Sequence, residues 1–247
     1  MRTPNTIPTA PQKSGPSTVA PTTTVNGFTL VELLIAIFIL SVIMVTLFGS
    51  FNAVFTQTEP IAQKMRLARM GQYCLNRIAD DLKQLRVTSA TAYTKPGVTS
   101  DPDPYRFLAE TQYLAGEEFP KLQFVSGAHI GRSRQAPFQY SAARITYYAQ
   151  ESSSGIILRR ADQLYPFGEF EPAPEDPVLC THLESLKFSF FDADGESRSV
   201  WNSDDESTDF STPVNVEIDL TLNNGTESLA LKTRVALATT RVAMTTP

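Results

Sequence analysis

The chain has 247 residues, a formal net charge of −5 and only two cysteines. Contact with nucleic-acid phosphates needs clustered Lys and Arg, so this acidic balance argues against a nucleic-acid partner. Two thiols cannot build a disulfide framework, so a chain of this length must fold around a hydrophobic core of its own.

Residues 1–26 form a Thr- and Pro-rich segment at the start of the chain. They lack the apolar content of a folded segment, so we expect them to be disordered. Together with Gly27 they carry Arg2 and Lys13 and no acid, so their removal takes the net charge from −5 to −7.

An apolar run follows the stretch Gly27-Phe28-Thr29-Leu30-Val31-Glu32. Residues 33–58 contain no charged side chain, and the run is long enough to cross a bilayer as a helix. Glu32 stands at the front of this run, where an ionised carboxylate costs on the order of 2.5–3.5 kcal/mol. A carboxylate at this position therefore needs a partner.

The Gly-Phe junction, the Glu four residues after Phe28 and the unbroken apolar helix resemble the processing site of type IV prepilins and pseudopilins. The resemblance implies that a prepilin peptidase cuts between Gly27 and Phe28 and methylates the new amino terminus of Phe28. It also implies that Glu32 meets the terminal amine of a neighbouring subunit during filament assembly. The leader is longer than is usual in this family, and Asn26 rather than Lys or Arg precedes Gly27.

Two other interpretations of this start remain open. An uncleaved signal anchor would leave the Glu32 carboxylate near the lipid headgroups, although a carboxylate inside an apolar run is unfavourable. A cleaved secretory signal fits less well, because the run is too long and no small-x-small site follows Phe48.

A second helical pattern begins after Glu59-Pro60. Because proline lacks an amide hydrogen and disfavours helix at the preceding residue, we expect a kink or a restart there. Apolar residues then recur at spacings of three and four: Ile61, Met65, Ala68, Leu75, Ile78, Leu82 and Leu85. The charged residues between them are assigned to a polar face: Lys64, Arg66, Arg69, Arg77, Asp80, Asp81 and Lys83. This pattern predicts an amphipathic helix, either the second half of a long spine helix or an ordinary packing helix.

Residues 88–139 contain many turn signals and few long apolar runs, so we expect an irregular surface insertion, with 122–125 as an edge strand. From residue 143 the pattern becomes β. Alternating segments separated by Gly and Asn turns predict strands at 144–149, 156–160, 186–190, 214–222 and 229–237.

The order of these C-terminal features is similar to the pseudopilin J family of type II secretion. The features are Leu186-x-Phe188-x-Phe190-x-Asp192, an Asp-Gly turn, Trp201, Pro213 and the alternating strand 214–222. The resemblance implies an α+β, pilin-like fold, in which a long N-terminal spine helix packs on an antiparallel β-sheet. Its expected parts are a leader at 1–27, a transmembrane and assembly helix at 28–58, the amphipathic second half of the spine helix at 59–87 and a periplasmic β-rich domain at 88–247.

The resemblance also implies a function. The chain would be a minor pseudopilin that helps to initiate the pseudopilus at its tip, with other minor and major pseudopilins and the prepilin peptidase as partners. It would sit in the bacterial inner membrane as a single-pass protein with its C-terminal domain in the periplasm. The alternatives are a minor type IV pilin used for adhesion or DNA uptake, and a membrane-anchored enzyme or binding module.

Sequence motifs for catalysis or cofactors are missing. There is no Gly-x-Ser-x-Gly, no phosphate loop and no Cys/His metal spacing, and His129 and His182 are isolated, so we expect no enzyme activity, cofactor or metal. The segment 192–196 is better explained as a hairpin turn than as a calcium loop. Cys74 and Cys180 could form a disulfide in an oxidising compartment, or could be two buried apolar residues.

Overall fold

The computed structural model describes residues 27–97, 101–128 and 142–242. The expected leader, apart from Gly27, therefore lies outside the described residues, as does His129. The internal contacts of the chain divide it into two compact units, Met1–Thr56 and Gln57–Pro247.

A 54-residue helix, α1 (Leu30–Lys83), belongs in part to each unit. In the first unit, Leu30–Asn52 is long and apolar enough to cross a membrane, with a mean hydropathy of 2.8. The backbone remains helical through Glu59 and Pro60, so the alternative of a restart at this point is wrong. A proline removes one backbone hydrogen bond from a helix, and the remaining hydrogen bonds on both sides of Pro60 keep the backbone helical.

In the second unit, a seven-stranded antiparallel sheet has the order β6-β5-β4-β3-β2-β9, and β1 also pairs with β3. Its strands are β1 (Leu85–Arg86), β2 (Leu108–Leu114), β3 (Glu117–Ser126), β4 (Ala143–Ser152), β5 (Gly155–Leu164), β6 (Val178–Cys180) and β9 (Trp201–Asn202).

A four-stranded antiparallel sheet has the order β11-β10-β7-β8. Its strands are β7 (Leu183–Phe191), β8 (Ser197–Arg198), β10 (Asn215–Asn223) and β11 (Ser228–Ala236), and a short 3-10 helix, η1 (Glu206–Thr208), lies between β9 and β10. Alternate residues of β10 are buried, as the sequence pattern predicts: Val216, Ile218, Leu220 and Leu222.

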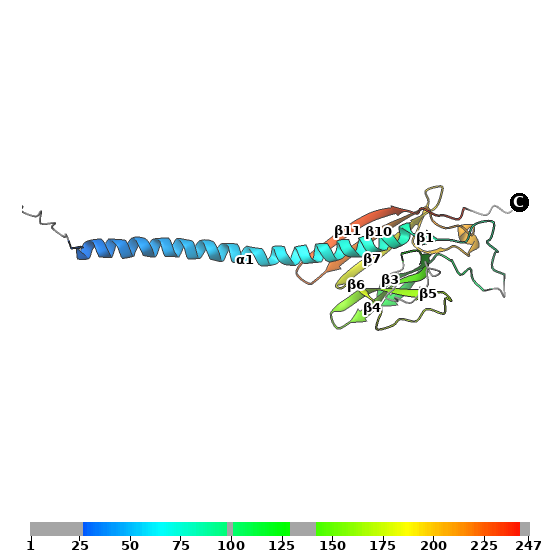
Figure 1. Ribbon diagram of the computed structural model, residues 1–247, viewed down its shortest axis with the longest axis horizontal. Coiled ribbons are helices and arrows are strands. Elements are labelled where there is room, and N and C mark those ends of the chain that lie inside the picture. The colour runs from blue at the N-terminus through cyan, green and yellow to red at the C-terminus, as the bar shows by residue number, and fades with distance from the viewer. Residues whose placement is uncertain (1–26, 98–100, 129–141, 243–247) are drawn as a thin grey trace, which may run out of the picture. The chain divides into compact units, whose positions relative to one another are not determined.

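The core of the second unit is formed by the buried side of α1 and both sheets. Figure 1 shows the later part of α1 running beside β10 and β11. The approach is close at Gly71, where an added Cβ would lie 2.6 Å from Cδ1 of Leu231 on β11. Aromatic rings join the two sheets, because Phe107 lies 5.8 Å from Phe124 of β3 and 5.6 Å from Phe190 of β7, measured between ring centroids.

The expectation of an irregular insertion at 88–139 holds for the described residues 88–97 and 101–107 but is wrong for 108–126, and the strand predicted at 122–125 is part of β3 and not an edge strand. β2 and β3 form a hairpin there, and β3 is an interior strand, with β4 on one side and β2 and β1 on the other. Its last five residues are all buried, which leaves no alternation for a sequence pattern to detect. The two-residue turn Ala115-Gly116 has φ of 51° and 85°, the left-handed values of a tight hairpin turn.

The buried stripe predicted from Ile61 begins later in the helix, because Ile61 and Met65 are 60% and 49% exposed and Leu67 is the first buried apolar residue of that segment. The predicted strands and the fold class are confirmed. Strands match each of the segments predicted after residue 143, with 214 and 237 falling one residue outside β10 and β11, and Gly195, with φ of 87°, occupies the turn between β7 and β8. The fold is α+β, with a long N-terminal apolar helix followed by antiparallel sheets.

Candidate functional site

The amino-terminal end of α1 is closed by a reciprocal pair of side chains, Thr29 and Glu32. The backbone amide and the hydroxyl of Thr29 donate to Oε2 of Glu32 at 2.9 and 3.0 Å, and the amide of Glu32 donates to Oγ1 of Thr29 at 3.3 Å. This is a capping box, which satisfies amides that have no partner within the helix. The negative side chain also lies at the positive end of the helix dipole.

Gly27 and Phe28 precede this cap in non-helical backbone. The Phe28 side chain is 86% exposed, and an added Cβ at Gly27 would meet nothing within 4 Å. The sequence-predicted site residues Gly27, Phe28 and Glu32 therefore lie together, within about one helical turn of each other. An accessible, non-helical peptide bond next to a capped helix is a geometry that a protease can bind.

The helix after the cap has an apolar surface in which the hydroxyls of Ser41 and Thr46 are hydrogen-bonded within the helix. Ser41 donates to the carbonyl of Ile37 at 2.7 Å, and Thr46 donates to the carbonyl of Ile43 at 2.8 Å. Hydrocarbon offers no hydrogen bonds, so such internal bonds suit a helix surrounded by lipid. Within Leu30–Asn52, Glu32 is the one charged residue.

A second carboxylate on α1, Asp81, lies in the core of the second unit and is fully buried. Oδ2 of Asp81 accepts hydrogen bonds from Nε of Arg160 at 2.6 Å and from the hydroxyl of Tyr147 at 2.5 Å. Nη2 of Arg77 lies 2.9 Å from Oδ1, an ion pair that forms no hydrogen bond at that oxygen. Arg160 is also paired with Asp162 at 2.9 Å.

Burial and these contacts shift the pKa values of the groups around Asp81. Burial, and then the negative charge of Asp81, raise the pKa of Tyr147 well above its ordinary value. Burial opposes the charge of Arg160 and is the largest single influence on its pKa, but the hydrogen bonds and charges of Asp81 and Asp162 together outweigh burial and raise the pKa of Arg160. The cluster is therefore a fixed set of charges that joins α1 to β4 and β5.

The prediction that Asp81 lies on the polar face of the helix is wrong, because the residue is fully buried. A usable signal was its spacing, because Asp81 follows Cys74 by seven residues and Ile78 by three and precedes Leu85 by four. That spacing places it in the buried stripe. Its charge led to the opposite assignment.

The two cysteines also lie in the second unit, one on α1 and one on β6. Cys74 and Cys180 are buried thiols whose Sγ atoms are 3.4 Å apart. His182, the described one of the two isolated histidines, follows closely on β6 with φ of 58°, and its carbonyl accepts from the amide of Asn223 at 2.9 Å.

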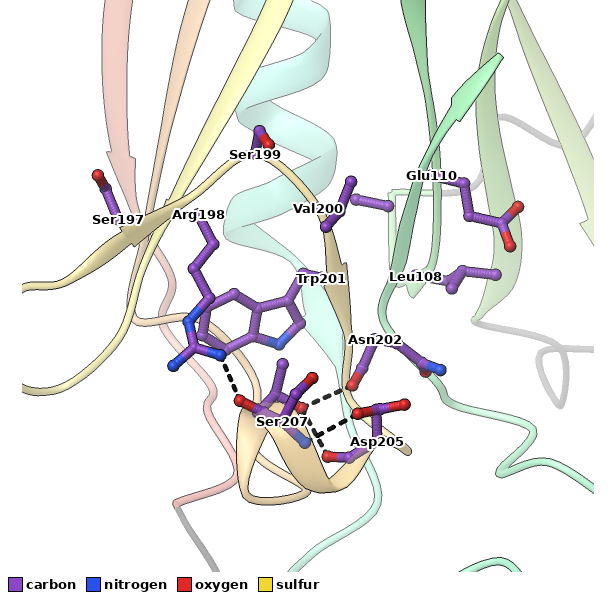
Figure 2. Close-up of a pocket in the computed structure, with 12 residues that line it drawn as sticks. Leu108, Glu110, Ser197, Arg198, Ser199, Val200, Trp201, Asn202, Asp205 and Ser207 are labelled. Carbon is purple, nitrogen blue, oxygen red and sulfur yellow. Dashed lines mark hydrogen bonds between the residues drawn. The ribbon is translucent and has the colours of Figure 1, made fainter.

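A pocket of about 610 Å³ lies between β2, β8, β9 and η1 (Figure 2). Trp201 forms part of its wall and donates from Nε1 to the carbonyl of Ser211 at 2.9 Å. Arg198 lies over the Trp201 ring, with Cζ 5.8 Å from the ring centroid, and donates to the carbonyl of Ser207.

The lining of this pocket does not assemble a nucleophile with a base. It contains serines but no histidine, lysine or cysteine. The carboxylate of Asp205 accepts from the amide of Ser207 at 2.8 Å, and hydrogen bonding to Ser207 lowers the pKa of Asp205. A general base at neutral pH needs the opposite shift.

Comparisons with known families match both parts of the chain. A family model described as Type II secretion system (T2SS), protein J matches residues 49–230. A model described as Prokaryotic N-terminal methylation motif matches residues 23–48, which include the Gly27-Phe28 junction and Glu32. A search of curated proteins finds no match.

Proposed function

Because the chain belongs to the type II secretion system protein J family, the minor pseudopilins J, which are structural proteins, we propose that it helps to initiate the pseudopilus from the tip of that filament. The proposed role is structural and not catalytic. The observation that carries it is the start of α1, where an exposed Gly27-Phe28 junction is followed by a capped helix whose segment Leu30–Asn52 contains Glu32 as its one charged residue.

The first step of the proposed mechanism is removal of the leader. Cleavage between Gly27 and Phe28 by the prepilin peptidase, followed by methylation of Phe28, creates a charged secondary amine at the end of an apolar helix. An isolated charge in hydrocarbon costs on the order of 2.5–3.5 kcal/mol, so both this amine and the Glu32 carboxylate need counter-ions.

The second step is pairing between subunits. A carboxylate can accept through both of its oxygens, so the bonds from Thr29 to Oε2 do not exhaust Glu32. The terminal amine of a neighbouring pseudopilin, at the same depth in the membrane, can then pair with Glu32. A subunit that joins the assembly therefore lowers the cost of two buried charges.

The proposed organisation follows from these steps. Residues 1–27 are the removed leader, 28–58 the transmembrane and assembly helix, 59–87 the second half of the spine helix and 88–247 the periplasmic β-rich domain. The protein is anchored in the inner membrane by one span, and its partners are other minor and major pseudopilins.

The test is a set of variants at Glu32 in cells that carry the secretion system. Glu32→Ala should be cleaved and inserted as well as wild type, because the apolar run is unchanged, but should lose co-purification with other pseudopilins and lose secretion. Glu32→Asp should be intermediate, because its shorter side chain reaches less far. Ser41→Ala is the matched control, since that hydroxyl only bonds its own helix. Wild-type complex and secretion in Glu32→Ala would overturn the role of the carboxylate.

Two measurements address the remaining parts of the proposal. Mass spectrometry of the mature protein should give an amino terminus at Phe28 that carries one added methyl. Deleting the chain should reduce the number of pseudopili but not the length of those that form, because initiation occurs once for each filament. Shorter filaments in unchanged number would contradict a role at the tip.

A further inference from the structure

Cys74 and Cys180 are the pair of groups whose placement the proposed function does not use. Their Sγ atoms are 3.4 Å apart, and both residues are buried, at 0% and 1% exposure. A second contact lies beside this one, where the amide and the hydroxyl of Thr181 both lie 3.5 Å from Sδ of Met70. Met70 and Cys74 are one helical turn apart, so the helix and the strand are held in register at two successive points.

The contact between Cys74 and Cys180 matters because of where Cys180 lies in the fold. β6 is a three-residue strand at the edge of the seven-stranded sheet, and it pairs with β5 at two positions. After two intervening residues the chain begins β7 of the four-stranded sheet at Leu183. Cys180 therefore stands at the crossover between the sheets, where few ladder hydrogen bonds hold the backbone.

We propose that Cys74 and Cys180 form a disulfide in the mature protein, which fastens α1 to the crossover between the two sheets. The proposal rests on the periplasmic location given above, because disulfides form and persist in oxidising compartments. The bond would close a loop between residues 106 positions apart, and long closed loops restrict the unfolded chain most.

The chemistry requires a disulfide donor, such as an oxidised dithiol protein of the compartment or oxidised glutathione. The thiolate of one cysteine attacks the donor, forms a mixed disulfide and releases the first donor thiol. The thiolate of the other cysteine then attacks the protein sulfur of that mixed disulfide and releases the second donor thiol. Two electrons and two protons pass from the cysteine pair to the donor.

The burial of Cys74 and Cys180 determines at which stage of folding the disulfide can form. The hydrogen bond to Cys180, and then burial, raise the pKa of Cys74, so a thiolate is strongly disfavoured in the folded protein. Exchange needs a thiolate and access to it, so the bond must form while the chain is folding. Once enclosed, it should resist reductants that do not unfold the protein.

The test uses the full-length wild-type protein, purified in detergent from membranes of cells that process it. It is denatured in the presence of an alkylating reagent, with and without prior reduction, and analysed by mass spectrometry. The expected result is no alkylation without reduction and two alkylated cysteines after reduction, with a linked peptide that contains Cys74 and Cys180. Cys74→Ala and Cys180→Ala should each show one free thiol.

A refolding arm distinguishes this proposal from the proposed function. Reduced, denatured wild-type protein refolded with reduced and oxidised glutathione should form the same link. Free thiols both in cells and after this refolding would overturn the disulfide and leave the pseudopilin role intact. Free thiols in cells together with a link after refolding would overturn the disulfide of the mature protein and would count against the periplasmic location.

Thermal unfolding measures the consequence of the bond. Reduction under denaturing conditions, followed by refolding without oxidant, should lower the Tm by on the order of 10 °C. The double variant Cys74→Ala/Cys180→Ala should have a Tm that does not respond to this treatment. A wild-type Tm equally insensitive to reduction would contradict the proposal, and the alkylation result does not depend on whether the variants fold.

Discussion

Two carboxylates on the same helix are satisfied in opposite ways. Glu32 takes its hydrogen bonds from Thr29, three residues away, in the part of the chain that the structure describes. Asp81 takes them from Tyr147 and Arg160, which are 66 and 79 residues away. A carboxylate with distant partners is fixed by the fold, whereas a carboxylate with a local partner can still be used by another molecule.

The difference follows from the residues that surround each carboxylate. The helix around Glu32 presents apolar side chains on every side and pairs its few polar groups within itself. The helix around Asp81 has one buried stripe, and β4 and β5 supply the Tyr and the Arg that the carboxylate needs. The carboxylate at the start of α1 is therefore available to another molecule, whereas the carboxylate near its end is used within the fold.

The largest expected effect comes from removing the buried carboxylate. Asp81→Ala leaves the positive charge of Arg160 and the hydroxyl of Tyr147 buried with fewer partners, so it should lower the free energy of unfolding by about 3–5 kcal/mol. Asp80→Ala is the control, because Asp80 is exposed and its pair with Lys83 is worth under about 1 kcal/mol. Urea titration of the purified proteins measures both changes. Equal losses in the two variants would mean that the buried cluster contributes no special stability.

A smaller loss of unfolding free energy is expected when Asp81 keeps its charge but loses one hydrogen-bond donor. Tyr147→Phe retains the ring that stacks 6.3 Å from Phe124 and removes only the hydroxyl, a hydrogen bond to a charged group worth about 1.5–3 kcal/mol. Tyr113→Phe is the matched control, since the hydroxyl of Tyr113 donates to an exposed glutamate. The same urea titration applies, and indistinguishable variants would contradict this ranking.

The sequence predicted the framework but not the buried charges. Alternation in β7 and β10 and the turn at residues 223–225 predicted three strands of the four-stranded sheet, because β7 and β10 have one buried and one exposed face, but the division into two sheets was not predicted. The segment 122–125 was predicted as an edge strand, whereas β3 is longer and interior, and its final residues are buried without the alternation that would have shown its extent. Asp81 was misassigned because the partners that permit its burial lie on strands more than 60 positions away, and no local pattern reveals them.

Alkaline pH should weaken the fold through Tyr147. Burial, and then the charge of Asp81, raise the pKa of Tyr147 well above 10, whereas an unfolded tyrosine ionises near pH 10. The unfolded state therefore loses its proton first, so this contribution to stability is complete below about pH 10 and falls above it by about 1.4 kcal/mol for each pH unit. The slope of unfolding free energy against pH should be shallower in Tyr147→Phe. Parallel slopes would show that Tyr147 ionises as readily in the folded protein as in the unfolded chain.

The smallest expected effect lies at the other carboxylate. Thr29→Ala removes one half of the capping box and should weaken the first turn of α1 by about 1 kcal/mol. The loss should remain local, because both members of the box lie within four residues, so the unfolding midpoint of the unit Gln57–Pro247 should not change. Hydrogen exchange of the detergent-solubilised protein should show faster exchange at residues 30–33, with recovery in Thr29→Ser. Thr46→Ala is the control, since its hydroxyl also bonds its own helix but caps nothing. If Thr29→Ala instead shifted the midpoint of global unfolding, the interactions of Glu32, like those of Asp81, would contribute to the stability of the whole fold.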